Sequence, residues 1–364
     1  MVRARQALMI MFALAVAGCS AQSEQAGEAT MNVKTLTGAP PVIIAHRGAS
    51  GERPEHTLAA YQLAIEQGAD FIEPDLVLTR DGVLVARHEN EISETTDVAD
   101  RPEFAARRTS KTIDGQEYSG WFTEDFTLAE LKMLRARERL PELRAANMQY
   151  DGQYEVPTFE EILQLLQKHE KKSGKRIGVY PETKHPGYFA TFGLDHDEQM
   201  LKLLKTYGYD GQDDPVFIQS FEVGNLQALN DKTGIRLVQL VASEGGPPDR
   251  ADLSFASMLT ADGLKEIATY ADGIGPSKDL VIGRNAVGLL GKPTGLVDAA
   301  HKAGLLVHPW TFRRENHFLP TDFKSGIDPR DAGDLAGEIR AYVAAGVDGL
   351  FSDNPAQAVS AVKQ

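Results

Sequence analysis

The sequence lacks several features that would each define a class of protein. Of its 364 residues only Cys19 is a cysteine, so the folded body can form neither a disulfide nor a thiolate metal site. The formal net charge is −14, and no long cluster of lysine and arginine is present. Because binding to a nucleic-acid backbone requires a basic surface, we expect no nucleic-acid partner. The apolar run near the N-terminus is too short to span a membrane comfortably.

That apolar run belongs to a pattern typical of bacterial export signals. Arg3 and Arg5 precede the run ALMIMFALAVA, and the segment 1–19 ends in Cys19. The ending resembles a lipobox, in which Cys19 would be lipidated and become the first residue of the mature chain. An ordinary cleavage near Ala21 is the alternative.

Residues 20–40 are rich in small and polar side chains, which is typical of a flexible tether. In proteins with this kind of signal, a serine after the cysteine usually permits sorting to the outer membrane. We therefore expect a periplasmic protein that touches the membrane only through a lipid on Cys19. The sequence leaves open whether the chain forms a homodimer.

Short apolar segments alternate with amphipathic helical patterns along residues 41–364, which predicts parallel βαβ units of an α/β protein. Eight expected strands favour a (β/α)₈ TIM barrel over an open sheet. The strands are expected at Val42–His46, Phe71–Leu78, Ile177–Lys184, Val216–Phe221, Leu237–Val241, Gly273–Pro276, Leu305–Thr311 and Gly349–Ser352. The helices are expected at Thr57–Gln67, Phe159–Lys172, Asp195–Tyr207, Val223–Asn230, Asp262–Tyr270, Thr294–Lys302, Leu335–Ala345 and Ala356–Val362.

One segment, residues 90–156, interrupts this alternation. It is charged and irregular and shows no clear βα unit. A long segment of this kind is commonly functional, and we expect it to be inserted after the second strand and to cap the barrel mouth. Within it we expect a helix at Leu128–Arg135.

Carboxylates lie at the ends of two expected strands. Glu73 and Asp75 are two residues apart on extended chain, so their side chains point to the same face. Buried together, they would repel each other unless a cation lay between them. Glu182 repeats the pattern with Lys184 beside it, and three such carboxylates suit one Ca²⁺ or Mg²⁺ ion better than Zn²⁺. Solvated acids and an ordinary Glu182–Lys184 pair are the alternatives.

Histidines and cations accompany these acids. His46 and His88 end neighbouring extended segments, and a pair of imidazoles suits general base and general acid catalysis near neutral pH. Arg47 and Lys184 supply positive charge for a phosphoryl oxygen, although Arg47 could instead hold a carboxylate.

Two aromatic residues also follow expected strands. Phe221 and Trp310 could form the wall of a substrate pocket, or they could simply pack at the barrel rim. At the start of the first helix, Pro54-Glu55-His56-Thr57 is interpreted as capping and support of the loop.

Taken together, these motifs resemble the glycerophosphodiester phosphodiesterase family, and most closely its bacterial periplasmic enzymes. The resemblance runs from about Pro41 to the C-terminus. The motifs that carry it are His46-Arg47-Gly48, Pro54-Glu55-His56-Thr57, Glu73-x-Asp75, Thr79-Arg80-Asp81-Gly82, His88, Tyr180-Pro-Glu-Thr-Lys184, Tyr270-Ala-Asp-Gly-Ile-Gly-Pro276, Val307-His-Pro-Trp310 and Gly349-Leu-Phe-Ser-Asp353. Two positions depart from the common pattern: His56 stands where the wider family often has asparagine, and Pro74 lies between the two acids.

The resemblance implies a TIM barrel with an inserted cap, in which His46 and His88 are the acid–base pair. Glu73, Asp75 and Glu182 would hold one divalent cation, Ca²⁺ rather than Mg²⁺, and Arg47 and Lys184 would contact phosphate. The implied activity is hydrolysis of glycerophosphocholine, glycerophosphoethanolamine and related diesters to sn-glycerol 3-phosphate and an alcohol. Two rival hypotheses remain: a phospholipase-type lyase on the same barrel, and a surface lipoprotein whose barrel is a binding module.

Overall fold

The structure is a computed structural model that describes residues 34–363. The expected export signal, Cys19 and the first part of the expected tether lie outside these residues. Within the described part, no helix is both long enough and apolar enough to cross a membrane.

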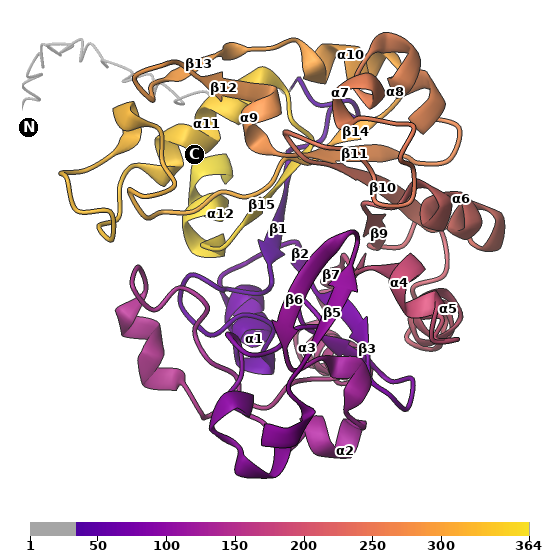
Figure 1. The fold of residues 1–364 in the computed structure, drawn as a ribbon. Helices are drawn as coiled ribbons and strands as arrows, with labels where there is room; N and C mark the ends of the chain where they lie inside the picture. Colours follow the sequence, from indigo (N-terminus) through magenta and orange to yellow (C-terminus); the bar gives the residue numbers. More distant parts are fainter. Residues whose placement is uncertain (1–33, 364) are drawn as a thin grey trace, which may run out of the picture. The chain divides into compact units, whose positions relative to one another are not determined.

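Parallel strands form the centre of the fold, with helices outside them (Figure 1). The first sheet contains β15 (Gly349–Ser352), β1 (Val42–His46), β2 (Phe71–Glu73) and β7 (Gly178–Val179), in that order. The second contains β14 (Leu306–Val307), β11 (Gly273–Pro276), β10 (Arg236–Val241), β9 (Phe217–Ser220), β8 (Glu182–Thr183), β3 (Asp75–Leu78) and β4 (Leu84–Ala86). All pairs are parallel except β3 with β4, which form the hairpin around Asp81-Gly82.

The two sheets are continuous with each other, because β2 runs on into β3 and β7 runs on into β8. At the other end, the chain after β14 bonds to β15: the Phe351 amide donates to the Pro309 carbonyl at 3.1 Å, and the Phe312 amide donates to the Phe351 carbonyl at 2.8 Å. Eight parallel segments therefore each have a bonded neighbour on both sides, which is the (β/α)₈ arrangement that the alternation predicts.

Prolines divide two of the expected strands. Phe71–Leu78 is interrupted at Pro74 and Ile177–Lys184 at Tyr180-Pro181, because proline has no amide hydrogen to donate to a neighbouring strand. The carbonyl groups still bond: Pro74 accepts from the Glu182 amide at 3.0 Å, and Pro181 accepts from the Gln219 amide at 2.9 Å. The acids beside these prolines are therefore held in register on adjacent strands.

The main helices fall where the amphipathic patterns predict them, within a few residues at each end. They are α1 (Leu58–Glu66), α3 (Phe159–Ser173), α5 (His196–Thr206), α6 (Val223–Lys232), α8 (Ala261–Ile267), α10 (Leu296–Lys302), α11 (Leu335–Ala345) and α12 (Pro355–Lys363). Thr57 caps α1 by accepting from the Ala60 amide, and Thr158 with Glu161 forms a capping box on α3.

Several short elements were not expected from the sequence. They are the helices α4 (Pro186–Ala190), α7 (Phe255–Met258) and α9 (Lys278–Val281), the hairpin of β12 (Ile282–Arg284) with β13 (Leu290–Pro293), and the hairpin of β5 (Thr109–Ile113) with β6 (Gln116–Gly120). Two expected elements are shorter than predicted. The expected strand Leu305–Thr311 contains only β14, and the helix expected at Leu128–Arg135 is α2 (Leu128–Leu131), because the Arg135 amide bonds to the Asp97 carboxylate instead of continuing the helix.

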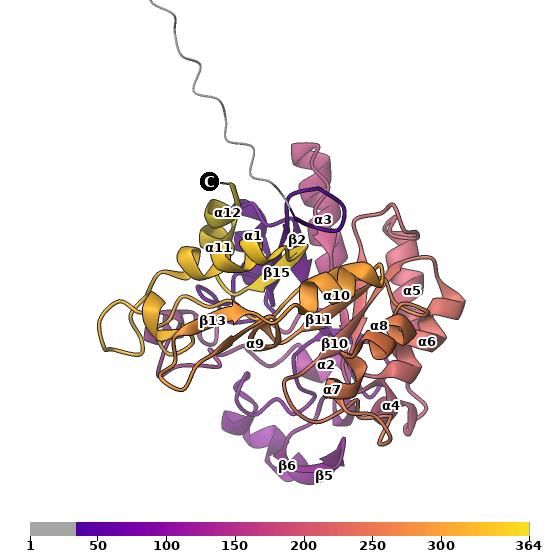
Figure 2. The same cartoon turned by 90° about the horizontal axis from the view of Figure 1, so that it is seen from above.

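The segment 90–156 contains α2, the β5–β6 hairpin and several single helical turns. Figure 2 shows the β5–β6 hairpin on the opposite side of the view from α11 and α12. The segment has buried apolar side chains of its own, including Phe104, Trp121 and Phe126, and these join the main hydrophobic core.

A second, smaller core fills the space among the strands. It consists of Ile44, Phe71, Tyr180, Phe217, Val238 and Phe351, all nearly inaccessible to solvent. These residues come from different strand segments around the ring, and their side chains pack together in its interior.

Candidate active site

A cavity of about 700 Å³ lies among the residues that follow the parallel strands. Eight of the nine site residues predicted within the described part of the chain line this cavity; they are His46, Arg47, Glu73, His88, Glu182, Lys184, Phe221 and Trp310. The ninth, Asp75, is buried beside the cavity and contacts Arg47 and His56. The fold thus brings together residues that are separated by more than two hundred positions in the sequence.

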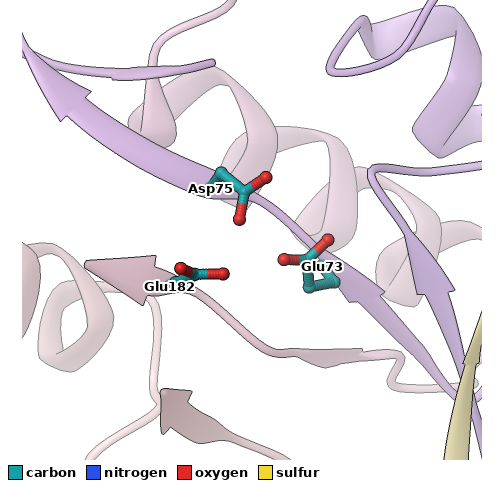
Figure 3. Close-up of side chains that lie close together, drawn as sticks. All are labelled: Glu73, Asp75 and Glu182. Atoms are coloured by element: carbon teal, nitrogen blue, oxygen red, sulfur yellow. The ribbon is translucent and has the colours of Figure 1, made fainter. Parts of the chain in front are cut away.

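The three carboxylates predicted as metal ligands converge. Each of Glu73, Asp75 and Glu182 offers an oxygen within 4.8 Å of the others', and Figure 3 shows the three carboxylate groups turned toward one another. Parallel pairing sets this geometry, because Asp75 lies opposite Glu182 in the register of β3 and β8.

The chemistry of the three carboxylates suits a divalent cation. All three side chains are buried, and Asp75 Oδ1 has no hydrogen-bond partner among residues 34–363. A buried carboxylate oxygen without a donor is costly, and a hard cation that prefers oxygen ligands would satisfy it. Glu73, Asp75 and Glu182 are therefore the residues that would hold one such ion.

The protein environment shifts the pKa values of the three carboxyl groups in different directions. Burial and the charge of Asp75 raise the pKa of Glu73, and burial raises the pKa of Glu182 to about 8, against the opposing effect of Lys184. For Asp75, the hydrogen bond from His56 and the charge of Lys184 outweigh burial, so its pKa is lowered. Without a cation, the site resists carrying three full negative charges.

His46 ends β1 and is oriented by a carboxylate from the last strand. Its Nδ1 atom lies 2.6 Å from Asp353 Oδ1, and both side chains are buried. Because an ionised carboxylate only accepts, Nδ1 carries the proton and Nε2 is left free to exchange one. Burial and the charge of Arg47 lower the His46 pKa to about 4, although Asp353 acts in the opposite direction.

His88 has a similar arrangement. Its Nδ1 atom is hydrogen-bonded to the Glu89 carboxylate. Burial together with the charges of Arg47 and Lys184 lowers the His88 pKa to about 3, even though 30% of the side chain remains exposed. Both imidazoles are therefore neutral near pH 7 in the ligand-free protein, and each presents an unprotonated Nε2.

Two cations, Lys184 and Arg47, pair with the acids of the site. Lys184 Nζ is 2.9 Å from Glu182. Arg47 Nη1 is 3.1 Å from Glu55, and the Arg47 amide donates to Glu73 at 2.8 Å. Arg47 holds a positive φ of 58°, a conformation that non-glycine residues adopt at a cost and that is common at functional sites. It therefore holds carboxylates, the alternative that the sequence left open, while it also lines the cavity.

The two aromatic residues predicted for a pocket wall, Phe221 and Trp310, both line the cavity. The ring centroids of Phe221 and Trp310 are 6.1 Å apart and the rings are nearly perpendicular. The Trp310 indole donates to the Gly275 carbonyl at 2.7 Å, which fixes its ring plane. Lys184 Nζ lies 5.9 Å from the Phe221 ring centroid, so the wall adjoins the charged part of the cavity.

Sequence reasoning missed the residues that orient the histidines. Asp353 directly follows β15, just as His46 ends β1, so its position at the end of a strand could have indicated a role in the site. Glu55 belongs to the motif Pro54-Glu55-His56-Thr57 and Glu89 directly follows His88, but neither was predicted to bind Arg139 or Arg47. Arg139 and Arg144 lie in the irregular segment 90–156, where no periodicity indicates which side chains turn inward.

Comparison with known proteins agrees with this geometry. Residues 46–357 match the Glycerophosphoryl diester phosphodiesterase family. The chain is 36% identical over 363 residues to the Arabidopsis thaliana glycerophosphodiester phosphodiesterase GDPD6, covering 95% of this chain and 93% of that protein. It is 31% identical over 384 residues to the Haemophilus influenzae glycerophosphodiester phosphodiesterase, covering 98% of each.

Solved structures with lower sequence identity share the fold. An Oleispira antarctica phosphodiesterase in complex with the product sn-glycerol-3-phosphate superposes with a TM-score of 0.59 at 21% identity, covering 91% of this chain and all of that one. An Agrobacterium tumefaciens glycerophosphodiester phosphodiesterase gives 0.54 at 20%, covering 88% and 99%. The family match spans every site residue from His46 to Asp353, and the chain belongs to the glycerophosphoryl diester phosphodiesterase family.

Proposed function

We propose that this protein hydrolyses glycerophosphodiesters, such as glycerophosphocholine and glycerophosphoethanolamine, to sn-glycerol 3-phosphate and an alcohol. One observation carries the proposal: two members of a carboxylate triad, two carboxylate-bound imidazoles and two cations line the same cavity, and the third carboxylate, Asp75, is buried beside it. Its relatives of 31–36% identity are named for this activity. The structure of the O. antarctica phosphodiesterase holds sn-glycerol-3-phosphate, the product proposed here.

Glu73, Asp75 and Glu182 would hold the divalent ion, and we propose Ca²⁺ because a buried all-carboxylate set suits its flexible oxygen coordination. When bound, the ion supplies positive charge against the phosphoryl oxygens. Lys184 pairs with Glu182 and Arg47 pairs with Asp75, so both positive charges lie next to the triad. A bound phosphodiester anion would be stabilised by these two positive charges as well.

The histidines would move the protons. The unprotonated Nε2 of one imidazole would take the proton of the attacking hydroxyl. The other imidazole, protonated when the anionic substrate is bound, would give a proton to the leaving alkoxide. The attacking hydroxyl belongs either to water or to the neighbouring glycerol carbon, and the latter would form a cyclic phosphate first.

A coupled assay for sn-glycerol 3-phosphate tests this proposal. We expect turnover of several head groups in the presence of Ca²⁺, loss of turnover in EDTA, and recovery when the cation is restored. No turnover of any glycerophosphodiester would overturn it. Accumulation of a stable cyclic phosphate would replace the hydrolase with a lyase, and binding without turnover would favour a binding module.

We also propose that the chain is exported and anchored through a lipid on Cys19, on the strength of the sequence pattern that precedes the described residues. Metabolic labelling with a radioactive fatty acid in a bacterial host tests this. The wild-type chain should be labelled and sediment with membranes, whereas the Cys19→Ser variant should be neither; equal labelling of both would overturn the anchor.

A further inference from the structure

Both proposed catalytic histidines are connected to arginines of one short stretch of the segment 90–156. Each connection has the same order: imidazole Nδ1, carboxylate, guanidinium. The two arginines, Arg139 and Arg144, are five positions apart in the sequence, and each is connected to a different histidine.

The His88 side runs through Glu89. Arg139 donates to both Glu89 oxygens, with distances of 3.0 and 2.6 Å. It also donates to both oxygens of Glu55, at 2.8 and 2.7 Å, and Glu55 in turn binds Arg47 at 3.1 Å. Among the described residues, Arg139 is the one arginine or lysine paired with Glu89. Its guanidinium thus supports both a proposed catalytic histidine and a proposed phosphate ligand.

The His46 side runs through Asp353. Arg144 Nη2 lies 2.6 Å from Asp353 Oδ2, while Asp353 Oδ1 binds His46. Arg144 is itself fixed by Glu315 at 2.6 Å and by the Ser50 carbonyl at 3.0 Å. A second arginine, Arg313, also reaches Asp353 Oδ2, at 2.8 Å. The Arg144, Asp353 and Glu315 side chains are each less than a tenth exposed.

We infer that Arg139 and Arg144 are positioning residues, through which the inserted segment fixes the orientation and tautomer of both catalytic histidines. The inference rests on the proposed function. Arg139 and Arg144 each act on a histidine through one carboxylate, Glu89 for His88 and Asp353 for His46. The segment is thereby a working part of the catalytic site and more than a cover over it.

The physical reason is that a carboxylate holds an imidazole only if it is itself held. A carboxylate bonded to a guanidinium through directional hydrogen bonds loses rotational freedom and stays ionised. The charges of His88 and Arg139 lower the Glu89 pKa, and those of Arg313, Arg144 and His46 lower the Asp353 pKa; in both cases they outweigh burial. An ionised partner keeps the proton on Nδ1 and leaves Nε2 free toward substrate.

The test compares Arg139→Gln, Arg144→Gln and the control Arg137→Gln. Arg137 lies in the same stretch, but its side chain pairs with the exposed Asp100 and does not contact the site. Glutamine keeps hydrogen-bonding capacity while removing the charge, which limits damage to the fold. Kinetics would be measured with glycerophosphocholine and Ca²⁺, alongside thermal unfolding of each variant.

We expect Arg139→Gln to lower kcat by roughly 10- to 100-fold, the usual effect of losing a residue that orients a catalytic ligand. KM should also rise, because Arg139 supports Arg47. Arg144→Gln should lower kcat less, because Arg313 still holds Asp353, and it should leave KM unchanged. Arg139→Lys should recover part of the loss, and Arg137→Gln should resemble the wild type.

A second readout does not depend on turnover. In protein labelled with ¹⁵N-histidine, imidazole signals report the tautomer of each ring, and His46→Ala and His88→Ala assign them. Arg139→Gln should shift the His88 signals alone, and Arg144→Gln the His46 signals alone. Unchanged imidazole signals in both variants would overturn the inference even if activity fell. If the wild type turned over no glycerophosphodiester, the proposed function would fail, while the imidazole spectra would still decide the positioning role.

Discussion

Nε2 of His56 lies 2.9 Å from Oδ2 of Asp75, and both side chains are inaccessible to solvent. The hydroxyl of Tyr61 bonds the other imidazole nitrogen at 2.7 Å. Because an ionised carboxylate only accepts, His56 must donate from Nε2 and accept the Tyr61 proton at Nδ1. The hydrogen bond from His56 thus fixes the orientation of Asp75, a proposed metal ligand.

Removing this support should weaken cation binding. We expect His56→Ala to lower Ca²⁺ affinity by roughly 10- to 100-fold, measured by isothermal titration calorimetry. His56→Asn keeps a side-chain donor and should retain most of the affinity. Equal Ca²⁺ affinity in His56→Ala and the wild type would show that Asp75 needs no such support.

Cation binding should also stabilise the fold. A divalent cation bound among the three buried carboxylates would relieve their mutual repulsion. At a Ca²⁺ concentration 100 times the dissociation constant, the free energy of unfolding should rise by about 2.7 kcal/mol, seen as a higher melting temperature. Glu182→Gln should reduce this rise and His46→Ala should keep it. A melting temperature that does not respond to Ca²⁺ or Mg²⁺ would contradict the metal site.

The two histidines should be separable from the cation in their effects. His46→Ala and His88→Ala should each lower turnover by roughly 10²- to 10⁴-fold, because each loses one proton transfer. Both variants should still bind Ca²⁺ like the wild type, since neither residue belongs to the carboxylate triad. Near-normal turnover in either variant would remove that residue from the mechanism.

Glu222 should make stability depend on pH. Burial raises its pKa to about 7, although the Gly187 amide, which donates to both oxygens at 3.1 and 3.0 Å, opposes the shift. A carboxyl whose folded pKa lies above its unfolded value binds more protons in the folded state, so it stabilises at low pH. That contribution is lost as the pH rises from about 4.5 toward 7.

Glu222→Gln removes this titration and is the matched variant. The difference in unfolding free energy between Glu222→Gln and the wild type should therefore increase from pH 5 to pH 8, by about 1.4 kcal/mol at most for each unit of pKa shift. Urea denaturation at the two pH values measures it. A difference that stays constant with pH would show that Glu222 titrates normally in the fold.

Periodicity alone predicted the repeating part of the fold. Apolar segments such as Val42–His46 and Gly349–Ser352 are short and alternate with amphipathic helices, and this alternation predicted that they would be strands of a parallel barrel. The acids and histidines at their ends were predicted for the same reason, because residues at the ends of parallel strands meet in space. The split of two strands at Pro74 and Pro181 was not predicted.

The inserted segment could not be predicted in the same way. Its β5–β6 hairpin and single turns are stabilised by particular contacts, such as the Trp121 indole on the Phe104 carbonyl at 2.7 Å, and such contacts leave no period in the sequence. Arg139 and Arg144 look like surface arginines until the fold brings Glu89 and Asp353 to them. The sequence shows these arginines and carboxylates but does not show which of them pair.

The partnership of His46 with Asp353 spans 307 positions of the chain. One partner lies on the first strand of the ring and the other directly follows the last strand. A chain that ends between residues 183 and 352, whether truncated or still being synthesised, therefore contains the three carboxylate residues and both histidines but lacks the carboxylate that orients His46. The order of synthesis itself delays assembly of the complete site until nearly the whole sequence has been made.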